Sequence, residues 1–202
     1  PLCIVLRLTG EGEVIFAQER IGRNKKKFYL FKFATMLKDS PYMQGGTITS
    51  SDDPRVLKVG KLLRKTKINE LPQLYNVIRG EMSLVGPRPL TEKEFNAYAD
   101  GDKQNILLMV PGLTGLGSVI FRDEESLFRH VKDATVFYRA EIAPYKGRLE
   151  SWYSNNRSVG TYLAIVYATF IGLFFPRSKV IWRLVRGIPV PPKSLERWIS
   201  SS

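Results

Sequence analysis

The chain has 202 residues, enough for one ordinary domain with a sizeable core. Apolar residues make up 44% and charged residues 25%, which excludes a disordered chain and a polytopic membrane bundle. Lys and Arg outnumber Asp and Glu by 31 to 19, and this net charge of +12 predicts an anionic partner: nucleic acid, a phosphorylated substrate or an acidic lipid surface.

The single cysteine and the single histidine narrow the chemistry further. Cys3 alone excludes internal disulfides and Cys-rich zinc sites, and His130 alone excludes His-based metal sites and most Ser-His or Cys-His nucleophile systems. We expect His130 to be a surface or packing residue. Any reaction must therefore use carboxylates, amides, hydroxyls, basic side chains and a recruited metal ion.

The first third of the chain predicts a short apolar segment, two strands and a loop. Leu2–Leu8 is apolar except for Arg7 and too short to span a bilayer, and no signal peptide is evident. The runs Glu13–Phe16 and Phe28–Phe33 are rich in β-formers and flank a turn-forming segment, which predicts an antiparallel hairpin. Ser40–Pro54 has the composition of a loop.

The middle of the chain predicts two helices and an ordered turn. Arg55–Arg64 has apolar residues at helical spacing, and so does Glu70–Ile78. Asn69 is placed as the N-cap of the second helix, with Pro72 in its first turn. The prolines and glycine of Glu81–Leu90 predict an ordered turn rather than a helix.

Helices are also predicted at Glu92–Tyr98 and Ser126–Glu141, with a Gly-rich extended segment, Val110–Val119, between them. We expect its glycines to permit close backbone approach. No internal repeat or flexible linker is visible. The predicted fold class is α+β, a mostly helical single domain with a small antiparallel hairpin and membrane-associated helices. We divide it into residues 1–150, a catalytic domain, and residues 151–202, a membrane-interacting extension rich in aromatic and basic residues.

The run Ser158–Pro176 contains no charged residue and is flanked by Arg157 and Arg177. As a helix it would be about 28 Å long, close to the thickness of a hydrocarbon core of about 30 Å. The Trp- and Arg-rich segments that follow suit the headgroup region. The sequence favours membrane contact without establishing a span, and a buried core helix with a basic tail is the alternative.

The densest group of charged residues lies at positions 64–90. Arg64 and Lys65 precede Glu70, and Arg88 is held between two prolines that restrict its backbone. A guanidinium held in this way loses little entropy on binding phosphate, and a carboxylate beside cations can recruit Mg²⁺ when phosphate oxygens complete the shell. The residues therefore predict a phosphate site, against the alternative of a solvated basic face with Glu70 countering a helix dipole.

Three blocks of sequence resemble a known family. QERIGRNKKKFYLFKFATM (18–36), DPRVLKVGKLLRKTKINELPQLYNVIRGEMSLVGPRPL (53–90) and PGLTGLGSV (111–119) are similar in order and spacing to the bacterial sugar transferases, the monotopic phosphoglycosyl transferases. The likeness covers about the first 120 residues.

The resemblance implies transfer of a sugar-1-phosphate from a UDP-sugar to undecaprenyl phosphate, with release of UMP and with Mg²⁺, at the cytoplasmic face of the bacterial inner membrane. The first membrane step of polysaccharide or glycoconjugate assembly has this chemistry. The family's mechanism uses an adjacent Asp-Glu pair: the Asp attacks the β-phosphate and forms a covalent phosphosugar intermediate, which the lipid phosphate then resolves. The family also enters the bilayer through a re-entrant helix bent at Ser-Pro, and Pro1 could be that proline. The implied partners are the UDP-sugar, undecaprenyl phosphate and membrane lipid, with a homo-oligomer left open.

This sequence departs from the family at the nucleophile, because Asn69 occupies the position of the Asp while Glu70 is kept. Three interpretations follow: an engineered substitution that traps substrate, a natural variant that uses another group such as Glu70, or a chain that binds without catalysing. We predict Asn69 and Glu70 as the catalytic pair, Glu70 as the metal ligand, and four phosphate ligands: Arg20, Arg64, Lys65 and Arg88.

Other charged residues are predicted to be structural. Asp53 and Arg55 form a local pair that fixes the loop, and the acidic residues at 123–125 form a solvated surface. A basic nucleic-acid-binding protein would explain the net charge but not the uncharged run at 158–176, and no helix-turn-helix, RNP or zinc-finger pattern is present. Nucleic acid is therefore not an expected partner.

Overall fold

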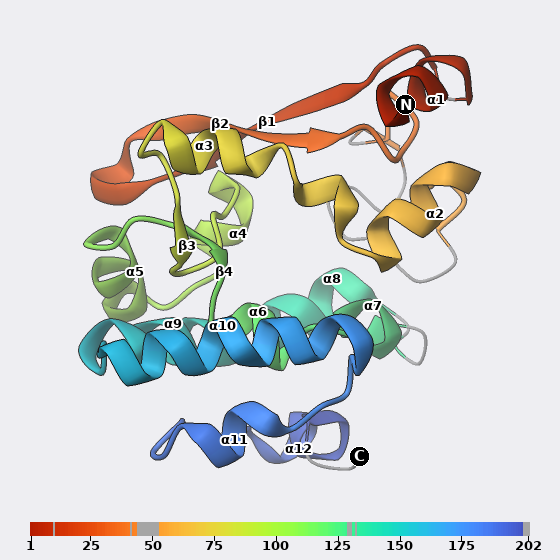
Figure 1. Ribbon diagram of the computed structural model, residues 1–202. Helices are drawn as coiled ribbons and strands as arrows, with labels where there is room; N and C mark the ends of the chain where they lie inside the picture. Colours follow the sequence, from red (N-terminus) through yellow and green to blue (C-terminus); the bar gives the residue numbers. More distant parts are fainter. Residues whose placement is uncertain (10, 41, 44–52, 129–130, 132, 200–202) are drawn as a thin grey trace.

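A two-stranded hairpin forms one side of the molecule in the computed structural model (Figure 1). The structure describes residues 1–202 except 10, 41, 44–52, 129–130, 132 and 200–202. β1 (Ile15–Ile21) and β2 (Lys27–Phe33) are antiparallel, with Ile15 opposite Phe33 and Ile21 opposite Lys27. The predicted hairpin is confirmed, and its first strand is longer than predicted.

The turn of the hairpin contains a 3₁₀ turn, η1 (Arg23–Lys25), in which Asn24 has φ 56° and Lys25 has φ 62°. Asparagine adopts this left-handed conformation more readily than most residues, so it suits the turn. Before the hairpin lies α1 (Leu2–Thr9). Most of the predicted loop at 40–54 lies outside the described residues, as does His130.

The segment after the loop crosses beneath the hairpin and carries the predicted site. Its elements in chain order are α2 (Lys58–Lys65), the 3₁₀ turn η2 (Ile68–Glu70), α3 (Gln73–Ile78), β3 (Ser83–Val85), α4 (Glu92–Asn96), α5 (Asp100–Leu107) and β4 (Gly112–Thr114). β3 and β4 are parallel, with Ser83 opposite Gly112. The first half of the predicted extended segment at 110–119 thus becomes a strand.

The helix predicted at 70–78 begins later than expected, and Asn69 does not cap it. The N-cap of α3 is Pro72, and Asn69 lies inside η2. Lys67, with a left-handed φ of 60°, precedes η2, and this 3₁₀ turn takes up the first residues of the predicted helix, so α3 starts only at Gln73. The apolar face of this segment is exposed: 53% for Leu71, 53% for Tyr75 and 84% for Ile78.

The remaining helices form two further layers, and the last two helices of the chain lie below the others in the view of Figure 1. They are α6 (Leu116–Ile120), α7 (Glu124–Leu127), α8 (Ala134–Phe137), the π-helical turn η4 (Tyr138–Ile142), α9 (Ala143–Asn155), α10 (Val159–Phe174), α11 (Val180–Leu184) and α12 (Lys193–Ile199). α6 corrects the extended structure expected for the second half of 110–119. The helix expected over 126–141 is interrupted instead of continuous.

The main core lies between these helices and continues to the C-terminal end. Leu116, Tyr145, Leu149, Ile165 and Leu195 are each 0% exposed within one cluster. Because helices on both sides of the predicted boundary at 150 share this cluster, and α9 crosses it, the chain forms one α+β unit. The division into two regions stays a prediction. None of the helices in the described part of the chain is long and apolar enough to cross a bilayer.

Candidate active site

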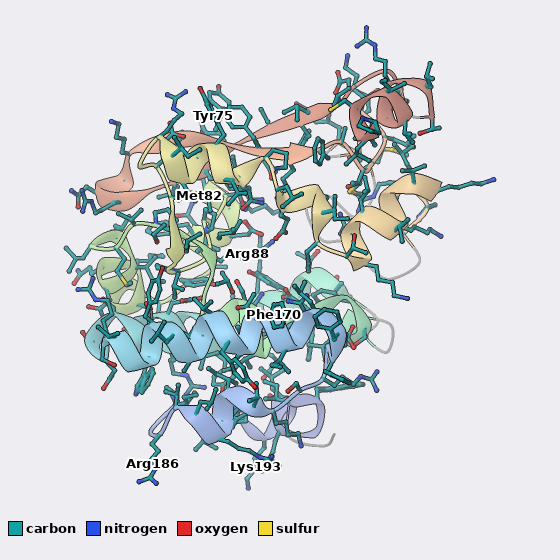
Figure 2. The ribbon with its side chains drawn as sticks, viewed as in Figure 1. Tyr75, Met82, Arg88, Phe170, Arg186 and Lys193 are labelled. Carbon is teal, nitrogen blue, oxygen red and sulfur yellow. The ribbon has the colours of Figure 1, made fainter. Side chains whose placement is uncertain are left out.

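A cleft of about 1380 Å³ lies between the layer that carries α2 and η2 and the layer that carries α10. β4 joins the two layers at its base, where the hydroxyls of Thr114 and Thr169 are 2.7 Å apart. In Figure 2, Arg88 points into the region between α3, marked by Tyr75, and α10, marked by Phe170. Eight cationic residues and three acidic ones line the cleft: Lys61, Arg64, Lys65, Lys67, Arg88, Arg122, Lys146, Arg177, Glu70, Asp123 and Glu124.

Glu70 is the acidic residue that the first wall of the cleft presents. Its Oε1 lies 3.4 Å from Nζ of Lys32 on β2, and about a fifth of each side chain is exposed. Burial raises the pKa of Glu70, but the charges of Lys32, Lys67 and Arg88 outweigh it and lower the pKa to about 2. Glu70 is therefore a carboxylate at every pH at which the protein would work.

Lys32 is the partner that the sequence did not reveal. Burial lowers the pKa of Lys32 to about 8, and Glu70 only partly opposes this shift. The neighbouring cations Arg88 and Arg20 also lower it. Lys32 is the next-to-last residue of β2, on the same face as the buried Phe28 and Leu30, so only a cation on the inward face of an apolar strand could have signalled a role.

Arg88 presents an exposed guanidinium to the cleft. Among the residues that the structure describes, this guanidinium has no hydrogen bond or ion pair, although the carboxylates of Glu70, Glu94 and Glu124 attract it. It also borders a second, smaller cavity. A cation that is held by a rigid backbone and carries no internal partner is suited to bind an anion from solution.

The backbone of Arg88 is fixed by a buried carboxylate on α9. Glu150 is 3% exposed and accepts hydrogen bonds from the backbone N–H groups of Arg88 and Gly117. A Cβ at Gly117 would lie 2.6 Å from Oε1 of Glu150, so only glycine fits there. At Gly115 a Cβ would lie 2.1 Å from the carbonyl oxygen of Gly86. The predicted close backbone approach is confirmed at Gly115, whereas Gly117 makes room for the side chain of Glu150, which sequence reasoning missed.

The second cavity, about 160 Å³, lies behind η2 and brings together the other predicted residues. Asn69 is 5% exposed there, and its Oδ1 has no hydrogen-bond partner among the described residues. The cavity has five cationic residues and two acidic ones in its wall: Arg20, Lys32, Lys38, Arg64, Arg88, Glu13 and Glu94. Position 69 is thus an amide in surroundings whose charge would favour a carboxylate.

Arg20 is committed within the protein. Its Nη1 lies 2.7 Å from Oε2 of Glu94 and donates to the carbonyl oxygen of Pro89, while Nη2 donates to Gln18. It is 6% exposed. These contacts anchor β1 to α4 and to Pro89, the residue after Arg88, and the predicted phosphate contact of Arg20 stays a prediction.

Arg64 and Lys65 lie at the end of α2 and both line the large cleft. Arg64 also borders the small cavity, where its Nη1 is 3.7 Å from Sδ of Met36. Four of the six predicted residues thus share the large cleft, and Asn69 and Arg20 lie on its neighbour.

The solvated surface predicted for the acidic residues does not extend to Glu124, whereas the Asp123 side chain is 40% exposed. Glu124 lies 2.7 Å from Nζ of Lys146, a side chain that is 7% exposed, and both residues line the cleft. Their sequence neighbours are polar, so the sequence did not predict this. The local pair of Asp53 and Arg55 is confirmed, with Nη2 and Oδ2 2.6 Å apart.

The carboxylates offer few ligands for a metal ion. No group of three His, Cys, Asp or Glu side chains comes together within the described residues. One carboxylate, Glu70, lies beside cations that favour phosphate. This set suits Mg²⁺ only where substrate phosphates supply most of the ligands, which is the usual arrangement for magnesium.

A cleft lined mostly by cationic residues, in an α+β fold of this order, is suited to a phosphorylated ligand. The chain belongs to the bacterial sugar transferase family, whose profile matches residues 1–176. This confirms the family that the three sequence blocks predicted.

Individual relatives agree with this assignment. The chain is 35% identical over 83% of its length to the UDP-galactose-lipid carrier transferase of Erwinia amylovora, and 33% identical over 84% to the undecaprenyl-phosphate galactose phosphotransferase of Salmonella typhimurium. It is 35% identical over 86% to the exopolysaccharide production protein ExoY of Sinorhizobium fredii. These matches cover 34%, 36% and 76% of the relatives, so the chain spans about a third of the first two.

Proposed function

We propose that this chain is the catalytic part of a phosphoglycosyl transferase that moves a sugar-1-phosphate from a UDP-sugar to undecaprenyl phosphate and releases UMP. The observation that carries the proposal is Glu70, an ionised carboxylate in a cationic cleft, with Lys32 at 3.4 Å and the unpaired guanidinium of Arg88 beside it. The names of the Erwinia and Salmonella relatives, a lipid carrier transferase and an undecaprenyl-phosphate phosphotransferase, support it.

The charge of the cleft suits this reaction. A UDP-sugar carries a diphosphate and the acceptor carries a phosphate, so the two substrates repel each other and the negative charge must be offset. We assign Arg64, Lys65 and Arg88 to the diphosphate. Mg²⁺ would be held by Glu70 together with phosphate oxygens of the donor, and it would offset the negative charge of those oxygens so that the phosphorus is more open to attack.

Asn69 decides whether the chain as given completes the reaction. An amide is a poor nucleophile, and loss of a nucleophile costs on the order of 10⁴–10⁶ in turnover. We propose that a carboxylate at position 69 is the nucleophile and that Asn69 leaves a chain that binds the donor without turnover. The cationic wall around its unpaired Oδ1 supports this.

Glu70 as an alternative nucleophile is the second candidate. It lines the large cleft, whereas Asn69 lines the small cavity. In that case the present sequence turns over without further change, which separates the two candidates by experiment.

We place the protein at the cytoplasmic face of the bacterial inner membrane. The exposed face of α10 supports this, because Val159, Leu163, Phe170 and Phe174 are 57–78% exposed and apolar. A single helix face of this kind lies on a bilayer surface rather than across it.

The test is UMP release from a panel of UDP-sugars by purified protein in vesicles that contain undecaprenyl phosphate and Mg²⁺. The variants are Asn69→Asp, Glu70→Gln and the double variant. We expect no UMP from the present sequence, release from Asn69→Asp, and a drop on the order of 10²-fold or more when Glu70→Gln is added. UMP release by the unchanged chain that Glu70→Gln abolishes would favour Glu70 as nucleophile. No release from any variant across the panel would contradict the proposal.

A further inference from the structure

Arg122, like Arg88, is an arginine of the cleft without a partner among the described residues, and its side chain lies over α10. A Cβ at Gly172 would be 2.9 Å from Cδ of Arg122 and 3.2 Å from Nε, so the side chain crosses the helix at this glycine. The negative charge of Glu70 attracts the Arg122 guanidinium. Within the described residues it has no hydrogen bond or ion pair, so a half-buried cation from the segment after α6 lies against α10 with its donors open to a ligand.

Apolar side chains of α10 lie beside Arg122. Val166, Leu173 and Phe174 line the cleft and are 39%, 41% and 66% exposed. Phe170, on the same helix, is 57% exposed, and its ring packs edge-on against Phe174 with centroids 5.5 Å apart. An apolar strip thus leads from the surface into the cleft and reaches a guanidinium.

We propose that this half of the cleft is an acceptor subsite, in which Arg122 binds the phosphate of a polyisoprenyl monophosphate and the strip Val166, Leu173 and Phe174 contacts its first isoprene units. The inference rests on the proposed function and deepens it, since the donor and the acceptor bind on opposite sides of the cleft.

Charge complementarity and the order of the groups support this assignment. Arg64 and Arg88 line the cleft from α2 and from the segment after β3, whereas Arg122 comes from the segment after α6 and crosses α10 at Gly172. An amphiphile whose chain lies along α10 therefore brings its phosphate to Arg122. A phosphate bound there faces Glu70, which is where the reacting groups of both substrates must meet.

The test is binding of farnesyl phosphate, UDP and inorganic phosphate to the full chain and four variants, by titration calorimetry in detergent. Arg122→Gln removes the cation, and Gly172→Ala displaces it without changing Arg122. Leu173→Ser alters the strip, and Arg186→Gln is a matched control, since Arg186 is exposed on the far side of α10 from the cleft (Figure 2). Circular dichroism checks that each variant is folded.

We expect Arg122→Gln to weaken farnesyl phosphate about tenfold, and UDP less than twofold, because one charge-assisted contact is lost. Gly172→Ala should weaken farnesyl phosphate in the same direction. Leu173→Ser should weaken farnesyl phosphate and leave inorganic phosphate unchanged, and Arg186→Gln should change nothing. Equal loss of UDP and farnesyl phosphate in Arg122→Gln would overturn the inference, as would no loss of either.

Two further outcomes distinguish failure of the acceptor subsite from failure of the proposed function. If the unchanged chain fails to bind UDP, the proposed function fails. If UDP binds normally but dioctanoyl phosphatidylglycerol displaces farnesyl phosphate at equal concentration, the strip is a general phospholipid contact and the acceptor subsite is wrong.

Discussion

The cleft works through single residues whose charge depends on their neighbours. Glu70 stays ionised because Lys32, Lys67 and Arg88 outweigh the cost of its burial. Burial lowers the pKa of its partner Lys32 to about 8, so Lys32 loses its proton near pH 8. One ion pair thus holds a permanent anion and a cation that can be titrated within the working range.

We predict that UDP binds more weakly as the pH rises from 7.5 to 9.5. Lys32 becomes neutral near its pKa of about 8, so the positive charge beside Glu70 is lost. Lys32→Arg should hold its affinity over this range, since arginine stays charged. Titration of UDP at several pH values gives the answer. The same pH dependence in both proteins would contradict the role of Lys32.

Glu150 gives a second pH effect, in stability. Burial raises the pKa of Glu150 to about 7, against the Arg88 and Gly117 N–H groups and the charges of Lys146 and Arg88. The folded state therefore holds a proton between about pH 4.5 and 7 that the unfolded state has lost. Stability falls as pH rises through this window, by up to about 3 kcal/mol.

Glu150→Gln should remove most of this slope, because the amide keeps an acceptor for one N–H group but does not titrate. Urea unfolding at pH 5, 6, 7 and 8 measures it for both proteins. Parallel curves would show that Glu150 does not titrate in the folded protein.

At the scale of helices and strands, the sequence predicted the elements whose residues are close together in the chain. The hairpin, α2, α4 and the tight glycines all follow from local alternation, spacing or backbone freedom. The pattern failed at α3, where Leu71, Tyr75 and Ile78 have core spacing but lie exposed. Periodicity identifies an apolar face without saying what covers it, and it does not reveal the left-handed conformation of Lys67.

The short helix α4 shows how one carboxylate serves two elements. Oε2 of Glu94 accepts from the backbone and hydroxyl of Thr91, which closes a capping box, and it also pairs with Arg20. Glu94→Gln should destabilise the protein by about 3 kcal/mol, because it leaves Arg20 buried without its counter-charge. Thr91→Ala loses only the cap, about 1 kcal/mol. Thermal or urea unfolding ranks the two, and equal losses would contradict the buried pair.

At the scale of the whole molecule, the cleft brings together residues that the sequence keeps far apart. Arg64, Lys65, Glu70 and Arg88 were predictable because they lie within 25 positions of each other, and the family resemblance pointed to them. Arg122, Lys146 and the α10 strip come from other elements, and only folding places them opposite Glu70. Their sequence neighbourhoods resemble an ordinary surface and an ordinary apolar helix.

The exposed face of α10 predicts how the molecule meets a lipid surface. The protein should float with vesicles that contain anionic lipid, and the double variant Phe170→Ser with Phe174→Ser should float several-fold less, because it exposes less apolar surface to the bilayer. Double replacement of Arg183 and Arg186 by Gln is the control for charge alone. Equal flotation of the Phe variant and the unchanged protein would show that α10 does not contact the bilayer.

The central claim is that the cationic cleft around Glu70 binds the diphosphate of the donor, and calorimetric titration of UDP tests it most directly. Arg88 has no ion pair or hydrogen bond with the described residues, so Arg88→Gln should weaken UDP about tenfold or more, while Arg186→Gln stays within twofold. Equal affinities in folded Arg88→Gln, Arg186→Gln and unchanged protein would contradict the account.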